Sequence, residues 1–471
     1  MKIYRLLLLL GVVGACLAAV NWPQFRGPNG SGVAETSGLP IEFGPEANVI
    51  WKTVLPPGYS SPALAGDRVF VTASDKDKLL TICLNRLTGK TEWQREAPRA
   101  RPSKKLGVNT PASPSPVTDG ENVYAFFEDF GLVSYAPDGK ERWRYPLGPF
   151  NAPYGMGSSP IVADGKVLLL CDQDTGSFFI ALDSGDGHQV WNTPRPEATH
   201  GFSTPAIYRP PKGPAQAIVS GSYQVAAYSL DTGEKLWWVH GMAWQAKSIP
   251  VIDGDRLFVH SWMESPVELG LQKAPPFADM LKLHDADHDG KLSKSEIPDE
   301  EMKKLWFLFD LDHDGVMSER EWGIHRARGD AGNGLFAIRL GGKGDITDTN
   351  SLWRFEKSLP NIPSPLLYKG VMYVLREGGI MTALDPGKGT VLTQGRIEGA
   401  LDPYYASPVA GDDKIHTLSQ SCKLGVLKAG AEWSVLAVND LKDDCWATPA
   451  IADGRLYVRT QSAMYCFGKK S

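Results

Sequence analysis

Several marks of common protein classes are missing from this sequence. Its 49 basic and 54 acidic residues leave a net charge of −5, so it lacks the positive excess that indicates a nucleic-acid surface. The longest apolar run, Leu6 to Ala19, has about 14 residues and is too short to span a bilayer as a helix. The six cysteines include no adjacent pair, and no motif places a nucleophile beside a base. The sequence therefore gives no sign of a nucleic-acid partner, a membrane-spanning helix or nucleophilic catalysis.

Turn-forming residues are abundant instead. The chain has 49 glycines and 35 prolines among 42% apolar residues, which suits a turn-rich all-β protein with a large core. Residues 158–191 read as four short strands separated by turn signals such as Asp164-Gly165 and Asp186-Gly187. One such unit is too small to bury its own faces, so it needs neighbours of the same kind.

The unit recurs along the chain, and its first strand carries a proline that follows Ser, Thr or Ile. These prolines are Pro62, Pro116, Pro160, Pro205, Pro250, Pro365, Pro408 and Pro449. Six of the seven intervals are 41 to 54 residues, whereas the interval from Pro250 to Pro365 is 115 and leaves room for about 70 inserted residues. Four strands at a period of about 45 residues predict an eight-bladed β-propeller.

A tryptophan marks the fourth strand of several repeats, four residues after a turn glycine. The pairs are Gly89 and Trp93, Gly139 and Trp143, Gly187 and Trp191, and Gly233 and Trp237. The glycine permits a tight turn, and we expect the indole to pack between neighbouring sheets as core. Leu392 stands near this place in the sixth repeat and Trp433 is out of register in the seventh, so those two blades are expected to be the least regular.

The two ends of the chain are predicted to share one blade. Residues 450–467 supply three strands of the eighth repeat, and residues 48–55, with Trp51, supply the fourth. The predicted fold is all-β, an eight-bladed propeller with a small α-helical insertion in blade five. The predicted segments are a signal peptide (1–20), an N-terminal arm (21–47), the propeller (48–263 and 334–468) and the insertion (264–333).

The N-terminus has the layout of a secretory signal, with Lys2 and Arg5 before the apolar run. Residues 13–16, Val-Gly-Ala-Cys, resemble a bacterial lipobox, which would lipidate Cys16; cleavage after Ala18 or Ala19 is the alternative. Either route exports the protein. In an oxidising compartment a disulfide between Cys422 and Cys445 is possible, since both are expected on one face of adjacent blades.

The repeated turn-and-tryptophan pattern resembles the pyrroloquinoline-quinone (PQQ)-like propeller repeat. That repeat is found in quinoprotein dehydrogenases and in the lipoprotein subunit of the outer-membrane β-barrel assembly machine. The opening Trp22-Pro23-Gln24-Phe25-Arg26-Gly27-Pro28 is similar to that of secreted bacterial propeller proteins of the same superfamily. The resemblance covers roughly residues 21–468 outside the insertion and implies the fold more strongly than an activity.

The insertion contains two complete twelve-residue loops of the EF-hand calcium-binding type. Three alternating aspartates, a glycine at position six and a glutamate at position twelve supply the oxygen ligands and the sharp turn. The predicted ligands of two calcium ions are Asp285, Asp287, Asp289, Lys291 through its carbonyl, and Glu296 in one loop, and Asp310, Asp312, Asp314, Val316 through its carbonyl, and Glu321 in the other. Leu292 and Met317 are expected to pair the two loops.

Short helices should flank these loops, with a mini-core of Leu281, Leu305, Phe309 and Trp322. The connector between the loops is tight, which favours a constitutively filled pair over a sensor. The insertion lies between the second and third strands of blade five. Because such loops share the face where a propeller binds its ligands, the pair is expected to overhang the mouth of the funnel.

Two functions remain open on the sequence. The first is a non-catalytic binding or scaffold protein of the cell envelope, periplasmic, anchored to the outer membrane or extracellular, with a protein or glycan partner and a monomeric state. The alternative is a PQQ-dependent alcohol or sugar dehydrogenase, although the adjacent-cysteine disulfide of that family is absent. Residues expected at the funnel entry are Tyr59, Asn109, Tyr154, His200, Gln245, Lys247, Asn361, Asp402, Tyr405 and Trp446. They form no recognised catalytic constellation.

Overall fold

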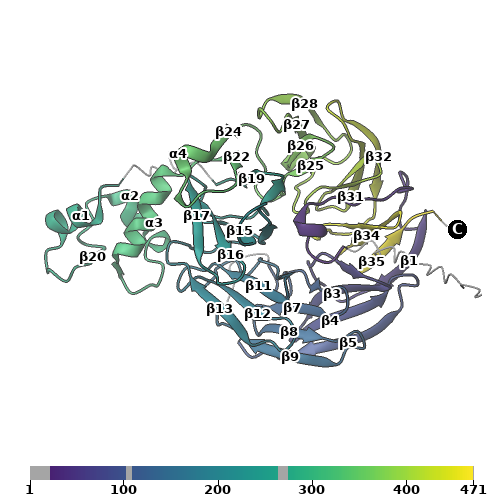
Figure 1. Cartoon of the computed structure of the whole chain (residues 1–471), viewed down its shortest axis with the longest axis horizontal. Coiled ribbons are helices and arrows are strands. Elements are labelled where there is room, and N and C mark those ends of the chain that lie inside the picture. Colours follow the sequence, from purple (N-terminus) through teal and green to yellow (C-terminus); the bar gives the residue numbers. More distant parts are fainter. Residues whose placement is uncertain (1–21, 102–108, 264–273, 470–471) are drawn as a thin grey trace, which may run out of the picture.

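The computed structural model describes residues 22–101, 109–263 and 274–469, and it is a ring of eight β-sheets around a central axis (Figure 1). The predicted signal peptide and Cys16 lie outside the described residues, as does the start of the predicted insertion. Within the described ranges, no helix is both long and apolar enough to cross a membrane. The eight-bladed propeller predicted from the proline spacing is confirmed.

Seven blades are built from consecutive strands or nearly so. Blade one has β2 (Ala63–Ala65), β3 (Arg68–Asp75), β4 (Lys78–Asn85) and β5 (Thr91–Ala97); blade two has β6 (Val117–Thr118), β7 (Val123–Phe127), β8 (Gly131–Tyr135) and β9 (Glu141–Pro146). Blade three has β10 (Ile161–Ala163), β11 (Lys166–Cys171), β12 (Phe178–Asp183) and β13 (Gln189–Pro194); blade four has β14 (Ala206–Tyr208), β15 (Gln216–Gly221), β16 (Gln224–Ser229) and β17 (Lys235–His240). Blade five has β18 (Val251–Asp253), β19 (Arg256–Ser261), β22 (Gly334–Arg339) and β24 (Ser351–Phe355). Blade six has β25 (Leu366–Tyr368), β26 (Val371–Arg376), β27 (Ile380–Leu384) and β28 (Val391–Arg396); blade seven has β29 (Val409–Gly411), β30 (Lys414–Leu418), β31 (Lys423–Lys428) and β32 (Ser434–Asp440).

The helical elements are few and mostly sit between β19 and β22. They are α1 (Phe277–His284), α2 (Glu300–Lys304), α3 (Glu319–Asp330), α4 (Thr347–Asn350) and the short 3-10 turns η1 (Pro28–Gly30), η2 (Trp306–Leu308) and η3 (Glu377–Gly379). The two-residue strands β20 (Leu292–Ser293) and β21 (Val316–Met317) pair with each other. Another short strand, β23 (Gly344–Asp345), lies parallel to β17 and gives blade four a fifth strand. The extra irregularity is therefore in blade four, whereas blades six and seven, expected to be the least regular, have four antiparallel strands each.

The last blade is closed by both ends of the chain, as predicted. It contains β33 (Ala450–Ala452), β34 (Arg455–Arg459), β35 (Ala463–Phe467) and, from the N-terminus, β1 (Val49–Val54). β1 pairs antiparallel with β35, and Trp51 lies opposite Cys466. The ring has no open edge at this junction because the first strand occupies it.

Fourth-strand tryptophans join their blades to the next ones through an indole hydrogen bond, except Trp237, which donates to Gln216 within blade four. The indole N–H of Trp51 donates to the carbonyl of Arg86 at 2.9 Å, and its ring lies against Gly89 of blade one. Gly89 has φ +71°, and a Cβ there would lie 2.6 Å from the ring, so the contact requires glycine. Equivalent indole-to-carbonyl bonds are Trp93 to Pro137, Trp143 to Ser184, Trp191 to Leu230 and Trp353 to Pro386. The prediction that these tryptophans are core is confirmed, and Trp353 extends the set to blade five.

The residues that precede the eight prolines form a belt of hydrogen bonds around the axis. In seven of the eight places the backbone N–H of one blade donates to a Ser or Thr hydroxyl of the next. The pairs are Ser61 to Ser115, Ser115 to Ser159, Ser159 to Thr204, Ile249 to Ser364, Ser364 to Ser407, Ser407 to Thr448 and Thr448 to Ser61, at 2.9 to 3.1 Å. Ile249 has no hydroxyl to offer blade four, so the belt is interrupted there. We call these eight residues the hydroxyl belt.

The N-terminal arm crosses the axis of the ring, where its purple ribbon lies at the centre of Figure 1. Arg26 is fully buried and donates from Nη2 to the carbonyl of Pro365 at 2.9 Å; burial lowers the pKa of its guanidinium to about 9. Other backbone contacts of the arm reach blades one, two, four, seven and eight, at Leu64, Thr118, Ile207, Ala410 and Gly454. Gly30 packs on Ile249 at the interruption of the hydroxyl belt. The arm therefore closes one end of the central channel.

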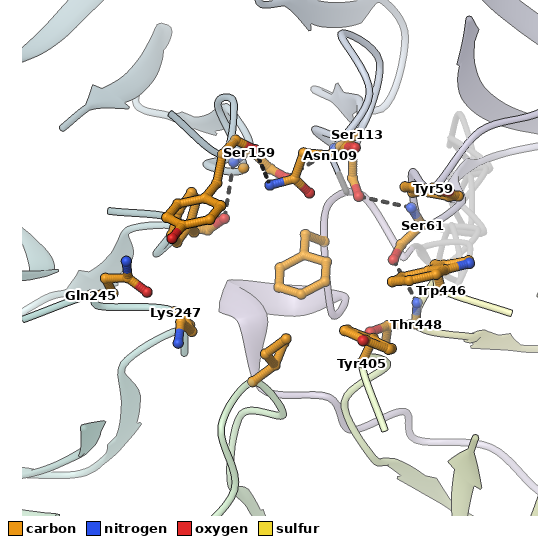
Figure 2. Close-up of a pocket in the computed structure, with 17 residues that line it drawn as sticks. Tyr59, Ser61, Asn109, Ser113, Ser159, Gln245, Lys247, Tyr405, Trp446 and Thr448 are labelled. Carbon is orange, nitrogen blue, oxygen red and sulfur yellow. Dashed lines mark hydrogen bonds between the residues drawn. The ribbon is translucent and has the colours of Figure 1, made fainter. Parts of the chain in front are cut away.

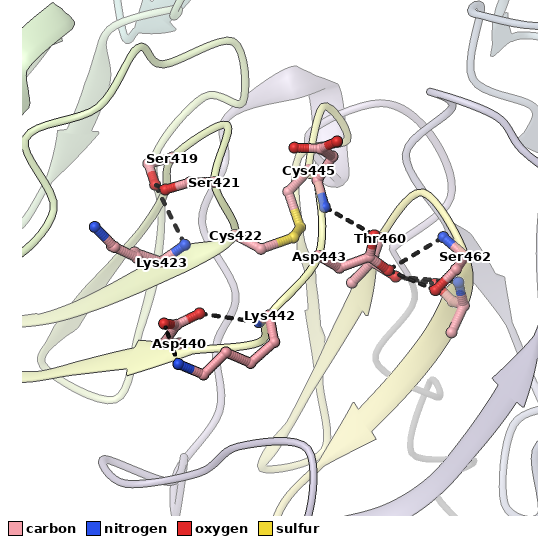
Figure 3. The surroundings of a disulfide bond; sticks show 12 residues. Ser419, Ser421, Cys422, Lys423, Asp440, Lys442, Asp443, Cys445, Thr460 and Ser462 are labelled. Carbon is pink, nitrogen blue, oxygen red and sulfur yellow. Dashed lines mark hydrogen bonds and ion pairs between the residues drawn. A yellow bond between two sulfur atoms is a disulfide. The ribbon is translucent and has the colours of Figure 1, made fainter.

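The Cys422–Cys445 disulfide, which the sequence allowed between blades seven and eight, is present (Figure 3). Its two Cα atoms are 4.9 Å apart and 23 residues separate the cysteines. The described cysteines outside this bond are Cys83, Cys171 and Cys466, all buried in strands. Cys83 and Cys466 lie in third strands of their blades, where the repeat pattern placed them.

Removal of β1, by deletion of residues 48–55, should expose the edge of β35 and cause aggregation, because an unpaired edge strand is a template for pairing between molecules. Size-exclusion chromatography and thermal unfolding measure the effect. The matched control is Val54→Ala, since Val54 is 79% exposed on the same strand. A deletion variant that stays monomeric with an unchanged melting temperature would contradict closure of the ring by β1.

Replacement of both Cys422 and Cys445 by serine should lower the free energy of unfolding by about 3 kcal/mol, since the bond closes a loop of 23 residues in the unfolded chain. Chemical denaturation of the oxidised protein and of the variant gives this difference. Reduction of the native protein before denaturation should reproduce it. Equal stability of all three samples would show that the bond does not restrain the unfolded chain.

Candidate functional site

A cavity of about 270 Å³ lies on the axis of the ring, inside the hydroxyl belt (Figure 2). Five belt residues line it, together with aromatic and amide side chains from the loops that enter the first strands. The lining residues are Phe25, Tyr59, Ser61, Asn109, Ser113, Ser115, Tyr154, Gly157, Ser159, Phe202, Thr204, Gln245, Lys247, Ile362, Tyr405, Trp446 and Thr448, of which Ser61, Ser115, Ser159, Thr204 and Thr448 belong to the belt. Phe25 comes from the arm, so the arm contributes to this cavity as well as closing the channel.

Seven of the ten residues expected at the funnel entry line this cavity: Tyr59, Asn109, Tyr154, Gln245, Lys247, Tyr405 and Trp446. The other three do not. His200 is buried behind Gln245, and Asn361 accepts a hydrogen bond from Lys247 outside the cavity. Asp402 accepts hydrogen bonds from the hydroxyls of Ser419 and Ser421 at 2.9 and 2.5 Å, beside the disulfide.

An aromatic wall forms one side of the cavity. Trp446 lies between Tyr59 and Tyr405, with ring centroids 4.8 and 4.2 Å from its own. Burial raises the pKa of Tyr59, and the nearby charge of Asp444 raises it further, so its hydroxyl stays protonated at neutral pH. Gln245 and Lys247 lie on the opposite side (Figure 2).

The side opposite the aromatic wall is held by buried polar groups. Asp174 Oδ1 is 2.5 Å from His200 Nδ1, and His200 Nε2 is 2.9 Å from Gln245 Nε2. Lys247 Nζ bonds to Asn361 and lies over the ring of Trp262, at 5.6 Å from its centroid. Among the residues described, Lys247 is the charged side chain in the cavity lining, and no carboxylate lines it.

The first acidic loop, residues 285–296, brings three carboxylates together. Ligand oxygens of Asp285, Asp287 and Asp289 lie within 4.8 Å of one another. Glu296 folds back over the loop and accepts the N–H groups of Ser293 and Ala286, each at 2.8 Å. These bonds, that of Ser293 first, hold the pKa of Glu296 below its ordinary value and keep it ionised.

The second acidic loop, residues 310–321, has the same layout in a more buried setting. Oxygens of Asp310, Asp312 and Glu321 lie within 4.8 Å of one another, and Asp310 and Glu321 are 5% and 2% exposed. Asp310 Oδ1 is buried without a hydrogen-bond partner among the described residues. A buried carboxylate oxygen without a donor fits a site for a cation. Both loops therefore contain acidic groups that can hold a metal ion.

The remaining predicted ligands lie where the two loops meet. Asp314 accepts the N–H of Val316 at 3.0 Å, and its other oxygen is 3.1 Å from Lys291 Nζ. Leu292 and Met317 pair in β20 and β21 and are fully buried, as the pairing of the loops predicted. Val316 is the first residue of β21, and Lys291 directly precedes β20.

The helical segment 274–333 has a core of its own. It buries Phe309 and Trp322, with Leu281 and Leu305 partly buried against them, as predicted. The segment projects outward from the rim of the ring (Figure 1) and contributes none of the described residues that line the cavity. The expectation that it overhangs the funnel mouth is therefore wrong. It packs sideways because its apolar residues Leu311 and Ile324 meet Tyr223 of blade four.

Polar contacts attach the second acidic loop and α3 to loops of blades two to four. Arg320 donates to the carbonyls of Asp174, Pro196 and Ala198 at 2.8 to 3.0 Å. Asn151 Nδ2 donates to the carbonyl of Leu311 at 3.1 Å, and the guanidinium of Arg328 lies 4.3 Å from the ring centroid of Trp244. Asp174 thus touches Arg320 with its backbone and His200 with its side chain.

Sequence reasoning missed part of the cavity. The hydroxyls could be recognised as the Ser or Thr before seven of the eight prolines, but their spacing does not indicate that they face the axis. Nothing in the arm indicates that Phe25 reaches the cavity. Phe202 and Ile362 lie in the loops before first strands, where no repeated pattern marks them.

Comparisons with known proteins agree with the fold. A family model described as the outer membrane protein assembly factor BamB matches residues 44–152 and 136–238. No curated protein sequence matches the chain. Similar solved structures include BamB from Moraxella catarrhalis (11% identity, 89% of this chain and 99% of that one, TM-score 0.57) and a europium-containing methanol dehydrogenase (10%, 96% and 98%, 0.59). The quinohemoprotein alcohol dehydrogenase from Comamonas testosteroni is also similar (12%, 97% and 82%, 0.58). At these identities the similarity shows the fold alone.

Proposed function

We propose that this propeller of the PQQ-like type is an exported, calcium-binding protein of the cell envelope that binds a protein or glycan in its axial cavity without catalysing a reaction. The observation that carries the calcium part is the pair of acidic loops with converging carboxylates. The observation that carries the binding part is a cavity lined by aromatic, amide and hydroxyl groups.

The two acidic loops are taken as an EF-hand pair inserted in blade five. Asp285, Asp287, Asp289 and Glu296 in the first loop, and Asp310, Asp312, Asp314 and Glu321 in the second, would each hold one calcium ion with the carbonyls of Lys291 and Val316. The unpartnered oxygen of buried Asp310 supports this assignment. Calcium would supply the positive charge that offsets four carboxylates in each loop.

The role proposed for calcium is structural. A sensor pair exposes a new apolar surface when it opens, whereas here Leu311 and Ile324 already pack on blade four with Tyr223. Arg320 and Arg328 fix α3 to the ring through carbonyls and the face of Trp244. A filled pair would keep the second acidic loop in place beside the propeller.

Export is supported by the N-terminal apolar run after Lys2 and Arg5, and by the Cys422–Cys445 bond, which belongs to an oxidising compartment. The family description as an outer membrane assembly factor agrees with the envelope. The mature protein is proposed to begin at a lipidated Cys16 or after Ala18 or Ala19, and thus to be an outer-membrane lipoprotein or a free periplasmic or extracellular monomer.

The cavity does not fit PQQ as a cofactor. That quinone carries three carboxylates and, in a dehydrogenase, works beside a metal ion that needs acidic ligands. The described lining has one cation, Lys247, which already bonds to Asn361, and no carboxylate. We therefore derive no redox step for this protein.

Glu296→Gln together with Glu321→Gln should abolish the binding of two calcium ions measured by calorimetry. The β-type circular dichroism should remain, because the loops lie outside the blades. At calcium 100 times above the dissociation constant, each lost site removes about 2.7 kcal/mol of stabilisation from the helical segment. Glu300→Gln with Glu301→Gln is the matched control, with the same charge change on exposed α2. Wild-type protein that binds no calcium at millimolar concentration would refute the assignment.

Mixing the purified protein with PQQ and calcium should leave the absorbance of the quinone unchanged and give no reduction of a dye by alcohols or aldose sugars. The reason is the lack of acidic and additional cationic groups in the cavity lining. Stoichiometric uptake of PQQ with substrate-dependent dye reduction would instead establish the dehydrogenase.

A further inference from the structure

One side chain in the cavity is oriented by a chain of buried hydrogen bonds. Asp174 Oδ1 accepts from the backbone N–H of His200 at 3.2 Å and lies 2.5 Å from its Nδ1. A carboxylate can only accept, so Nδ1 carries a proton. Gln245 Nε2 is 2.9 Å from His200 Nε2, and an amide nitrogen can only donate, so Nε2 accepts this bond. The carbonyl oxygen of Gln245 is thereby left for the cavity that this residue lines.

A second amide in the cavity is held in a similar way. Asn109 Nδ2 donates to the carbonyl of Tyr154 at 3.0 Å, which leaves its Oδ1 as an acceptor. Asn109 and Gln245 come from different blades, and Figure 2 shows both at the cavity. The cavity therefore offers two fixed acceptors to a ligand that carries hydrogen-bond donors.

The rest of the described lining holds one cation and no carboxylate. Lys247 is already engaged by Asn361 and by the face of Trp262. A ligand carboxylate would face carbonyl oxygens at Asn109 and Gln245, where like partial charges repel. The wall of Tyr59, Trp446 and Tyr405 lies opposite Gln245 and suits an apolar ring surface.

We infer that the axial cavity binds a neutral sugar ring, whose C–H groups contact the aromatic wall and whose hydroxyls donate to Gln245 and Asn109. The inference rests on the proposed binding function and names its ligand class. His200 and Asp174 are positioning residues that set the direction of the Gln245 amide and do not line the cavity.

The experiment titrates the full-length mature protein, in calcium, with neutral di- and trisaccharides of hexoses and N-acetylhexosamines, and with the matched oligomers of hexuronic acids. Calorimetry and tryptophan fluorescence report binding. We expect at least one neutral series to bind, and the affinity of its hexuronic counterpart to be at least about tenfold lower. Each lost or repelled hydrogen-bond partner lowers the affinity by roughly a factor of ten.

Two substitutions test the acceptor and its orientation. Gln245→Leu should weaken the neutral sugar about tenfold, while Gln394→Leu, a control on outer strand β28, should leave affinity unchanged. His200→Phe keeps a ring among Tyr154, Phe202 and Trp244 but frees the Gln245 amide to rotate. It should reduce the preference for neutral over acidic sugar, a ratio that simple loss of stability would not change.

Each other result has a distinct meaning. Equal or tighter binding of hexuronic sugars, or unchanged affinity in Gln245→Leu, would overturn the inference. A protein that binds no sugar, but captures an envelope protein in a way that Trp446→Ala abolishes, would overturn the inference of a sugar ligand. The proposed binding function would then still hold. Stoichiometric uptake of PQQ would overturn both.

Discussion

The hydroxyl belt is the contact on which the geometry of this protein depends. A proline, which has no N–H, directly precedes each first strand, and in seven of the eight places the residue before it donates its N–H to the hydroxyl of the next blade. The bonds of the belt join neighbouring blades close to the axis, and several of its members line the cavity. The single apolar member, Ile249, is where the arm packs through Gly30, so the interruption in the belt is filled by the segment that closes the channel.

The helical segment is inserted in the sequence of blade five, but it contacts loops of blades two to four. Arg320 bonds to the backbone of Asp174, and the side chain of the same aspartate holds His200 against Gln245. A chain of four hydrogen-bonded residues, Arg320, Asp174, His200 and Gln245, therefore connects the second acidic loop to the cavity. A displacement of α3 would therefore change the position of Gln245 in the cavity first, because packed polar networks have few alternative arrangements.

The repeat could be predicted from the sequence, whereas the path of the chain between repeats could not. Proline spacing and the glycine-to-tryptophan interval reflect contacts that recur in every blade, so eight blades, closure through Trp51 and most funnel residues followed from them. Cys422 and Cys445 were placed by the same repeat. The sideways position of the helical segment depends on a few contacts, such as Ile324 with Tyr223, that occur once in the molecule. The reach of Phe25 to the cavity depends on the arm, which has no repeat to compare. The identity of the ions and of the envelope partner remains a prediction.

The N-terminal arm makes contacts with residues that are synthesised near the end of the chain. Thr36 accepts the N–H of Gly454, 418 residues later, and Asn439 binds the carbonyl of Ile41 across 398 residues. Contacts of such separation form slowly, because the chain between them must be ordered first. Blades one to seven can each pair their strands locally as they emerge, whereas the arm and β1 have no complete partner surface until residue 467 has been made. The segment that is synthesised first among the described residues is thus the last to reach its native place.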